Sequence, residues 1–182
     1  MGRTYAAIDD RLASFLQAQP VFFVASAPLS GEGLVNCSPK SNNGELTVID
    51  PQHVAYLDRT GSGVETIAHL RENGRIVLMF CAFQGPPRIV RIHGHGTVVA
   101  RDDEDFVHLS GRFTTDRLQG TRSVIVVSAE RIADSCGYGV PLMDLRSHRR
   151  QLAEWVDRKG DEGIREYWES TNSKSLDDLP AL

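Results

Sequence analysis

The spacing of apolar residues changes along the chain and predicts a mainly β protein that begins and ends with helices. Between residues 4 and 17 apolar residues return every three to four positions, the period of an amphipathic helix, and Pro20 ends this pattern. Runs rich in β-branched and aromatic residues follow, separated by glycine and proline turns, which is typical of antiparallel strands. The strand candidates cover residues 21–27, 34–37, 46–49, 53–57, 75–83, 88–100 and 123–129.

Helical patterns are few and lie between or after these strands, at residues 65–72 and near residues 102–109. Because the strands are joined mostly by short turns, the pattern favours a closed or partly closed antiparallel barrel of about six strands over a βαβ sheet. After residues 136–141, apolar residues return at helical spacing and predict two helices packed on the barrel. These residues are Leu145, Leu152, Trp155, Val156, Ile164 and Trp168.

One domain is expected over residues 1–182, because no repeat, low-complexity tract or Gly-, Ser- or Pro-rich linker divides the chain. Within it, we expect an N-terminal helix at residues 1–18, the barrel at residues 20–132, and a C-terminal loop and helical cover at residues 133–182.

Composition favours small-molecule chemistry in a reducing compartment. The net charge of -4 is mild and charges of both signs are interspersed, so neither nucleic acid nor a membrane surface is indicated as a partner. Cys37, Cys81 and Cys136 form an odd, widely spaced set, which argues against a disulfide framework and a zinc ribbon. The N-terminus lacks the apolar run of a signal peptide, and no segment approaches the ~18 apolar residues of a membrane span. We expect a soluble, unprocessed, cytoplasmic protein.

The most informative segment is a small, hydroxyl-rich turn between a strand candidate and a helical pattern. Gly61 and Gly63 allow backbone amides to approach a ligand, and Thr60 and Ser62 offer hydroxyl groups. A helix that starts near Val64 adds the positive end of its dipole, so the turn suits an anion such as a phosphate group. The alternative is that Thr60 or Ser62 only caps the helix. The turn matches neither the dinucleotide fingerprint nor the phosphate-loop consensus.

Lys40 follows Ser38 and Pro39 at the end of a strand, and the proline cannot donate to a sheet ladder. A lysine there suits contact with a phosphate or a heteroatom-rich ring, and a solvated surface lysine is the alternative.

The strand near residues 88–94 carries charge within an apolar run, with Ile89, Arg91 and His93 on one face. Arg91 then either meets a ligand or forms an ion pair with Asp58 or Glu65.

No residue set stands out for metal binding or nucleophilic catalysis. His93 and His95 share a strand face, but no spacing rule selects a third ligand, so no metal site is expected. The three cysteines lack neighbours that lower a thiol pKa, and we expect buried structural thiols. A chain with phosphate-binding elements and no evident acid, base or nucleophile is expected to take its reactive group from a bound cofactor.

Five segments in order resemble the flavin-binding split-barrel family whose best known member is pyridoxamine 5'-phosphate oxidase, and most closely its branch of oxidase-related proteins. They are VNCSPK, YLDRTGSGVET, GRIVLMFCAF, PRIVRIHGHG and SCGYGVP, and the likeness spans nearly the whole chain. The resemblance implies a mainly β fold, a six-stranded antiparallel split β-barrel with flanking helices. It also implies a homodimer that binds FMN at the subunit interface.

The resemblance further implies which residues contact the cofactor. Lys40 falls where the family has a flavin-contacting lysine, Thr60 to Gly63 fall in the turn that holds the FMN phosphate, and Arg91 lies in a strand that approaches the flavin. The expected cofactor-binding residues are Asn36, Ser38, Lys40, Tyr56, Asp58, Arg59, Thr60, Gly61, Ser62, Gly63 and Arg91. No metal ligand is expected, and no side chain is assigned a catalytic role.

The chain departs from the true oxidases at three places. The oxidases have a Ser-Arg-Lys cluster where this chain has Gly61, Ser62 and Gly63, a glutamine where it has Ile89, and an arginine-rich ending that is missing after Trp168. The cation that neutralises the cofactor phosphate must therefore come from elsewhere. The candidates are Lys40, Arg59, Arg91 and an arginine of the facing subunit such as Arg122.

We therefore expect an FMN-dependent oxidoreductase that acts on a small organic molecule and is not a true pyridoxamine phosphate oxidase. Its partners would be that substrate and a second copy of the chain, without nucleic acid or membrane. Two alternatives stay open: a flavin- or tetrapyrrole-binding protein that stores or senses its ligand without turnover, and a deazaflavin in place of FMN.

Overall fold

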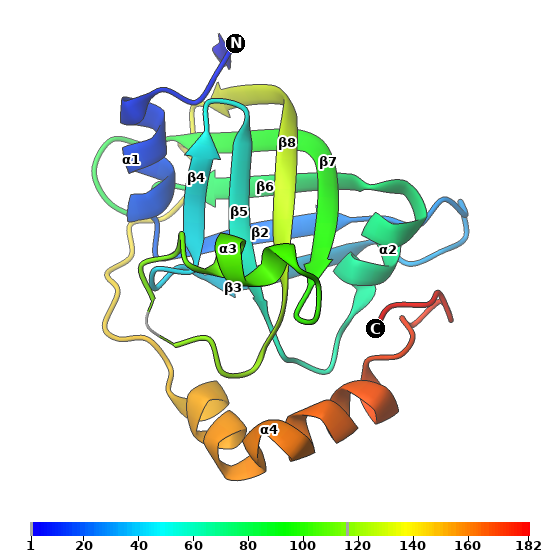
Figure 1. Cartoon of the computed structure of the whole chain (residues 1–182). Helices are drawn as coiled ribbons and strands as arrows, with labels where there is room; N and C mark the ends of the chain where they lie inside the picture. Colours follow the sequence, from blue (N-terminus) through cyan, green and yellow to red (C-terminus); the bar gives the residue numbers. More distant parts are fainter. Residues whose placement is uncertain (1, 116) are drawn as a thin grey trace.

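The computed structural model describes residues 2–115 and 117–182, and an antiparallel sheet curled into a half-barrel forms its centre (Figure 1). Within these residues the sheet has eight strands in the order β3-β2-β6-β7-β8-β5-β4, with β1 paired to β8. The strands are β1 (Thr4–Tyr5), β2 (Val21–Ser26), β3 (Asn36–Ser41), β4 (Leu46–Asp50), β5 (His53–Arg59), β6 (Arg75–Cys81), β7 (Ile89–Ala100) and β8 (Thr121–Ser135).

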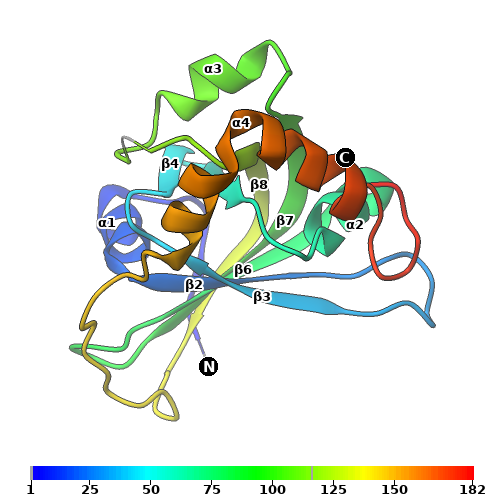
Figure 2. The same cartoon turned by 90° about the horizontal axis from the view of Figure 1, so that it is seen from below.

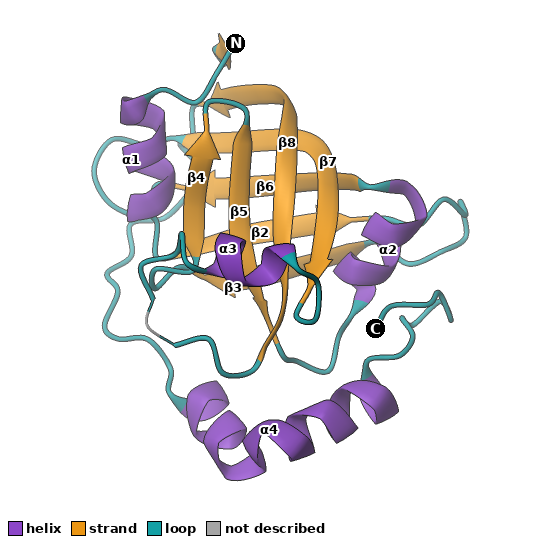
Figure 3. Ribbon diagram, in the orientation of Figure 1, coloured by secondary structure: helices purple, strands orange, loops and turns teal. Residues whose placement is uncertain are grey.

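Helices flank the sheet unevenly (Figure 3). They are α1 (Asp10–Ala18), α2 (Glu65–Asn73), α3 (Asp105–Ser110) and α4 (Gln151–Thr171). Helices α3 and α4 lie on one side of the molecule, whereas no helix lies beyond β2 and β3 on the other side (Figure 2). No helix in the described ranges is long and apolar enough to cross a membrane.

The mainly β, antiparallel architecture is confirmed, but the expected count of six strands is wrong. Strand β1 has only two residues, and so short a strand leaves no periodic pattern in the sequence. It pairs with Ile132 and Ala133 of β8. The N-terminal helix is correspondingly shorter than predicted: it begins at Asp10, and the carboxylate of Asp9 caps it by accepting a hydrogen bond from the Leu12 amide at 2.7 Å.

The predicted C-terminal helices are two segments of α4, which meet at Gly160. The φ of 66° and ψ of 175° at Gly160 belong to a region that only glycine occupies readily, so the helix breaks there. Leu145, expected in the first of these helices, lies in the irregular chain before α4.

The concave face of the sheet carries the main core, whose side chains are buried. Phe22 lies at its centre, with its ring centroid 5.5 Å from those of both Tyr56 and Phe80. Other fully buried members are Leu12, Leu16, Val24, Val54, Ile67, Leu78, Ile92 and Ile125.

Strand β3 directs polar residues to this same inner side. Asn36, Ser38 and Lys40 pair with residues of β2 whose side chains are buried, and successive residues of a strand point to opposite faces. Cys37 and Pro39 therefore face outward and are exposed. This edge strand brings a lysine, a hydroxyl and an amide to the rim of the barrel, next to the end of β5.

The outer face of β2, β3, β6 and β7 is apolar over most of its width. Its side chains are half-buried or exposed within a single chain, and they form two rows across the strands. The rows are Pro39, Phe23, Met79 and Arg91, and Cys37, Ala25, Val77 and His93.

Candidate functional site

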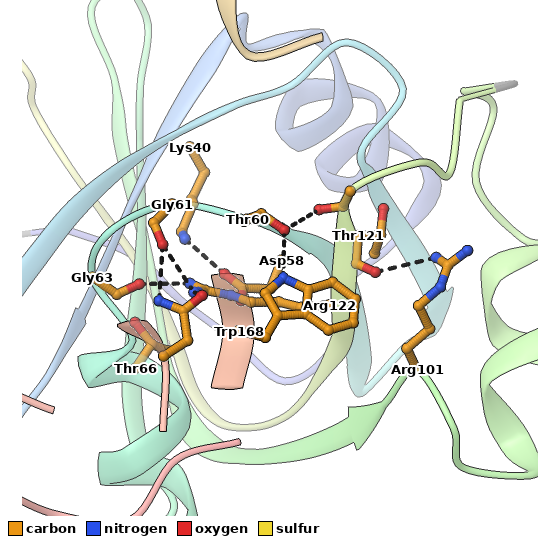
Figure 4. Close-up of polar contacts among 12 residues, drawn as sticks. Lys40, Asp58, Thr60, Gly61, Gly63, Thr66, Arg101, Thr121, Arg122 and Trp168 are labelled. Atoms are coloured by element: carbon orange, nitrogen blue, oxygen red, sulfur yellow. Dashed lines mark hydrogen bonds and ion pairs between the residues drawn. The ribbon is translucent and has the colours of Figure 1, made fainter. Parts of the chain in front are cut away.

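The turn that joins β5 to α2 is held through its carbonyl oxygens (Figure 4). Arg122, at the start of β8, donates from Nη2 to Gly63 O at 2.7 Å and from Nη1 to Gly61 O at 3.4 Å. Asn172, which follows α4, donates from Nδ2 to Gly61 O at 3.0 Å and to Ser62 O at 3.4 Å. All three carbonyl groups are thus directed toward Arg122 and Asn172.

The backbone amides of the turn are left for a ligand. In the described part of the chain, the N–H groups of Gly61, Ser62 and Gly63 donate to no protein atom. A Cβ added at position 61 would meet no atom within 4 Å, so the space over the turn is open. Helix α2 begins after Val64 without a side-chain cap, so the alternative that Thr60 or Ser62 caps it is wrong. Uncapped amides at a helix start attract anions.

A cavity of about 240 Å³ lies beside the turn and combines cations, hydroxyl groups and one carboxylate. Its lining residues are Ser38, Lys40, Arg59, Gly61, Ser62, Gly63, Glu65, Thr66 and Arg122. A second cavity of about 420 Å³, bounded by the first segment of α4, shares Lys40 and Arg59 with it.

Two cations share one buried carboxylate at this cavity. Asp58 is 0% exposed, and it accepts hydrogen bonds from Arg122 Nε at 2.6 Å and from Lys40 Nζ at 2.8 Å. Burial alone would raise the pKa of the Asp58 carboxyl, but the positive charges of Lys40 and Arg122 outweigh it and hold this pKa below its usual range. The three groups therefore carry one net positive charge at neutral pH, and Glu65 adds a carboxylate to the lining of the same cavity.

Arg59 lines the cavity, but its guanidinium is committed to protein partners. It forms an ion pair with Glu45 at 2.7 Å and donates to Thr121 Oγ1 at 2.8 Å and to Arg117 O at 2.6 Å. These bonds join β5 to the segment before β8. Of the predicted cations, Lys40 is thus better placed than Arg59 to meet a ligand.

Thr60 is 2% exposed and belongs to the wall of the second cavity. Its hydroxyl donates to Gly120 O at 2.8 Å and accepts a hydrogen bond from Trp168 Nε1 at 2.8 Å, and its amide also donates to Gly120 O. The hydroxyl and the backbone amide of Thr60 therefore both have hydrogen-bond partners within the protein.

A chain of polar side chains runs from the cavity wall into the protein. Ser38 Oγ donates to Asn36 Oδ1 at 2.8 Å, and Asn36 Nδ2 donates to Thr66 Oγ1 at 3.0 Å. Deeper in, Ser26 Oγ lies 3.0 Å from Nδ1 of the buried His69, and burial lowers the pKa of that imidazole. These hydrogen bonds connect strand β3 to helix α2 and fix the orientation of the Asn36 amide and the Ser38 hydroxyl at the rim.

Five of the expected cofactor residues do not line this cavity in a single chain, namely Asn36, Tyr56, Asp58, Thr60 and Arg91. Tyr56 is fully buried in the core, where its hydroxyl has no hydrogen-bond partner among the described residues. Arg91 lies on the outer face of the sheet and donates to Ser135 Oγ at 3.2 Å. The ion pair of Arg91 with Asp58 or Glu65 is wrong, because Asp58 pairs with Lys40 and Arg122 instead.

Three residues that hold the turn were missed or misplaced by the sequence analysis. Arg122 was one of four candidate cations and was considered only as a residue of the facing subunit, but Arg122 of the same chain holds the turn. Trp168 was expected only as a helix residue packed on the barrel, yet Trp168 and Asn172 both bind the turn. Arg122 follows the rule already applied to Arg91: an arginine in an apolar strand needs a carboxylate, and Asp58 in the apolar strand β5 supplies it. No physical rule of this kind selects Asn172, although the resemblance to the oxidase-related branch includes the ending from Asn172 to Pro180.

The thiols and imidazoles form no centre of their own in the described ranges. Cys81 is buried, and burial raises the pKa of its thiol, but Cys37 and Cys136 are exposed, so the expectation of three buried thiols is wrong. Cys37 is exposed because strand alternation turns it to the outer face. No group of three or more His, Cys, Asp or Glu side chains in the described residues is arranged to hold a metal ion.

Comparisons with known proteins identify the family of the chain. A sequence profile described as Pyridoxamine 5'-phosphate oxidase matches residues 8–136. The chain belongs to this family. It is 39% identical over 194 residues to the Pyridoxamine 5'-phosphate oxidase family protein ustO of Aspergillus flavus, a match that covers 98% of this chain and 77% of that protein.

Solved structures show that the fold is a split barrel. HupZ of Group A Streptococcus matches with a TM-score of 0.54 and 17% identity over 75% of this chain and 99% of its own. An FMN-binding protein from Syntrophomonas wolfei matches with a TM-score of 0.51 and 15% identity over 76% of this chain and 91% of its own. At these identities the likeness concerns the fold alone.

Proposed function

We propose that the protein is an FMN-dependent oxidoreductase that acts on a small organic molecule. The observation that carries this proposal is the turn at residues 61–63, which presents free amides and an uncapped helix start to a cavity whose Lys40, Arg122 and Asp58 hold one net positive charge. This donor set suits a phosphate monoester. The open space over Gly61 gives the phosphate room to approach the backbone.

The residues of the cavity have distinct tasks in this proposal. The turn amides and Lys40 hold the phosphate, and Arg122 supplies charge from behind the turn. Asn36 and Ser38, which follow one another along the inner side of β3, orient the ring system at the rim. Bound FMN supplies hydride transfer at its N5 atom, and the protein supplies orientation and a site shielded from water.

A homodimer with the cofactor at the subunit interface is part of the same proposal. It is supported by the outer face of β2, β3, β6 and β7, where Phe23, Ala25, Val77 and Met79 form an apolar surface that no helix covers. A second copy packed on this surface would bury it. In such a dimer Arg91, which lies in the same rows, faces the partner and stays a candidate for contact with the partner's flavin.

Flavin loading tests the proposal directly. The purified protein is incubated with FMN, riboflavin or a deazaflavin cofactor, and the bound fraction is measured after gel filtration. We expect one FMN per chain, bound more tightly than riboflavin. Substitution Lys40→Met should weaken FMN binding about tenfold or more, because a charge-assisted hydrogen bond contributes about 1.5–3 kcal/mol. The matched control Lys174→Met changes an exposed lysine and should leave binding unchanged. Protein that retains no FMN would overturn the proposal.

Anaerobic mixing with NADH or NADPH then separates enzyme from carrier. Reduction of the flavin followed by reoxidation by a small-molecule acceptor supports the oxidoreductase. Flavin that stays oxidised with every donor supports the storage or sensing alternative. Pyridoxamine 5'-phosphate serves as a further substrate, and we expect no turnover, since residues 169–182 contain no arginine-rich stretch like that of the true oxidases. A cytoplasmic location stays a prediction that cell fractionation tests.

A further inference from the structure

The second segment of α4, residues 161–171, contacts the turn between β5 and α2 from outside the cavity. Trp168 Nε1 donates to Thr60 Oγ1 at 2.8 Å, and the same hydroxyl donates onward to Gly120 O (Figure 4). One indole N–H therefore connects α4 to the first residue of the turn and, through it, to the loop that precedes β8. Trp168 does not line the cavity beside the turn.

Asn172 makes a second connection and uses both ends of its side-chain amide. Its Nδ2 donates to Gly61 O and Ser62 O, while its Oδ1 accepts a hydrogen bond from Arg122 Nη1 at 2.9 Å. Asn172 is 0% exposed. A buried side chain with every polar atom engaged has one orientation, so Asn172 fixes the arginine and the turn relative to each other.

Peptide geometry converts these contacts into control of the phosphate donors. In a planar trans peptide the C=O of one residue and the N–H of the next point in opposite directions. Holding the carbonyls of Gly61 and Ser62 against Asn172 therefore turns the amides of Ser62 and Gly63 away from it. Those are amides that donate to no protein atom in the described residues.

We propose that Trp168 and Asn172 are positioning residues of the cofactor-phosphate site: Asn172 sets the direction of the turn amides and Trp168 anchors the start of the turn at Thr60, and neither touches the ligand. This inference rests on the proposed function. It assigns the second segment of α4 a specific role, since the segment tightens binding of the phosphate group rather than of the flavin ring.

Paired binding measurements with FMN and riboflavin test the role, because the two ligands differ only in the phosphate. Substitutions Trp168→Phe, which keeps a ring and removes the N–H, and Asn172→Ala should each raise the dissociation constant for FMN about tenfold and leave that for riboflavin within about twofold. The control Trp155→Phe changes the other tryptophan of α4, which packs against Tyr167, and should change neither constant.

Equal weakening of FMN and riboflavin would show a merely structural role and overturn the inference, as would wild-type affinity for FMN in both variants. Wild-type protein that binds FMN no more tightly than riboflavin would instead refute the proposed phosphate site.

Hydrogen exchange of the wild-type protein provides a measurement that no folding defect of a variant can obscure. Coupling between two sites is reciprocal, so a phosphate bound at the turn should slow amide exchange in residues 161–172. FMN is expected to protect this segment and riboflavin is not. Equal protection by both ligands, or none by a fully bound FMN, would contradict the positioning role.

Discussion

Arg122 donates a hydrogen bond from Nε to Asp58 Oδ2 at 2.6 Å, and both side chains are at least 96% buried. Neither residue can leave the other without a large cost, since an unpaired charge in the protein interior is strongly unfavourable. The pair therefore places a fixed cation behind the turn at residues 61–63, in a chain whose turn contains no arginine or lysine.

Substitution Asp58→Asn should destabilise the fold by about 3–5 kcal/mol, because it leaves Arg122 buried without its counter-charge. Urea denaturation of apo protein measures the loss. The control Asp178→Asn affects an exposed ion pair with Lys174 and should change stability by less than about 1 kcal/mol. Near-wild-type stability of Asp58→Asn would show that the ion pair contributes little.

The folded protein should lose stability in acid as the Asp58 carboxylate becomes protonated. The pKa of Asp58 is lower in the folded protein than in the unfolded chain, where it is about 4. Its contribution is therefore fully present above pH about 4 and is lost as the pH falls through the lower, folded value. Thermal unfolding between pH 7 and pH 2 should show this loss, and the Asp58→Asn variant should show a flatter acid limb than wild type.

Substitution Gly61→Ala should separate ligand binding from folding. No atom lies within 4 Å of the added Cβ and the backbone there has no positive φ, so the melting temperature should be nearly unchanged. The methyl group would occupy space over the turn and should weaken FMN binding more than riboflavin binding. The control Gly31→Ala also adds a Cβ in open space and should leave both ligands unaffected. Unchanged FMN affinity in Gly61→Ala would place the phosphate elsewhere.

Substitution Met79→Asp should test the outer face as a subunit interface. Met79 lies in a row with Phe23 and Arg91, and burial of a carboxylate there against a second copy carries a desolvation cost that pairing with Arg91 would repay only in part. Sedimentation velocity should show a dimer for wild type and a monomer for the variant. A monomeric wild-type protein would contradict the proposed assembly.

The sequence supported the prediction of those parts of the site that depend on short-range patterns. Pro39 and the extended pattern before it marked Ser38 and Lys40 as residues at the end of a strand, and the glycines and hydroxyls at residues 60–63 marked the turn. These signals lie within a few residues of one another, so spacing rules can detect them.

The rest depends on contacts between residues far apart in the chain. Asn172 meets Gly61 across 111 positions and Trp168 meets Thr60 across 108, and no local pattern reports such a pairing. The burial of Tyr56 could not be predicted from the sequence either. Residues Ala55 and Leu57, which alternate with Tyr56, face a second, smaller core, so both faces of β5 are covered.

The break in α4 at Gly160 determines which substitutions can alter the site from a distance. The dihedral angles of Gly160 are strongly unfavourable for any residue with a side chain. The direction of the second segment of α4 therefore depends on a residue that lines neither cavity beside the turn. A substitution at position 160 would move the indole of Trp168 and the amide of Asn172 together. Under the proposed function, the affinity for FMN can therefore change during evolution while every residue in contact with FMN stays the same.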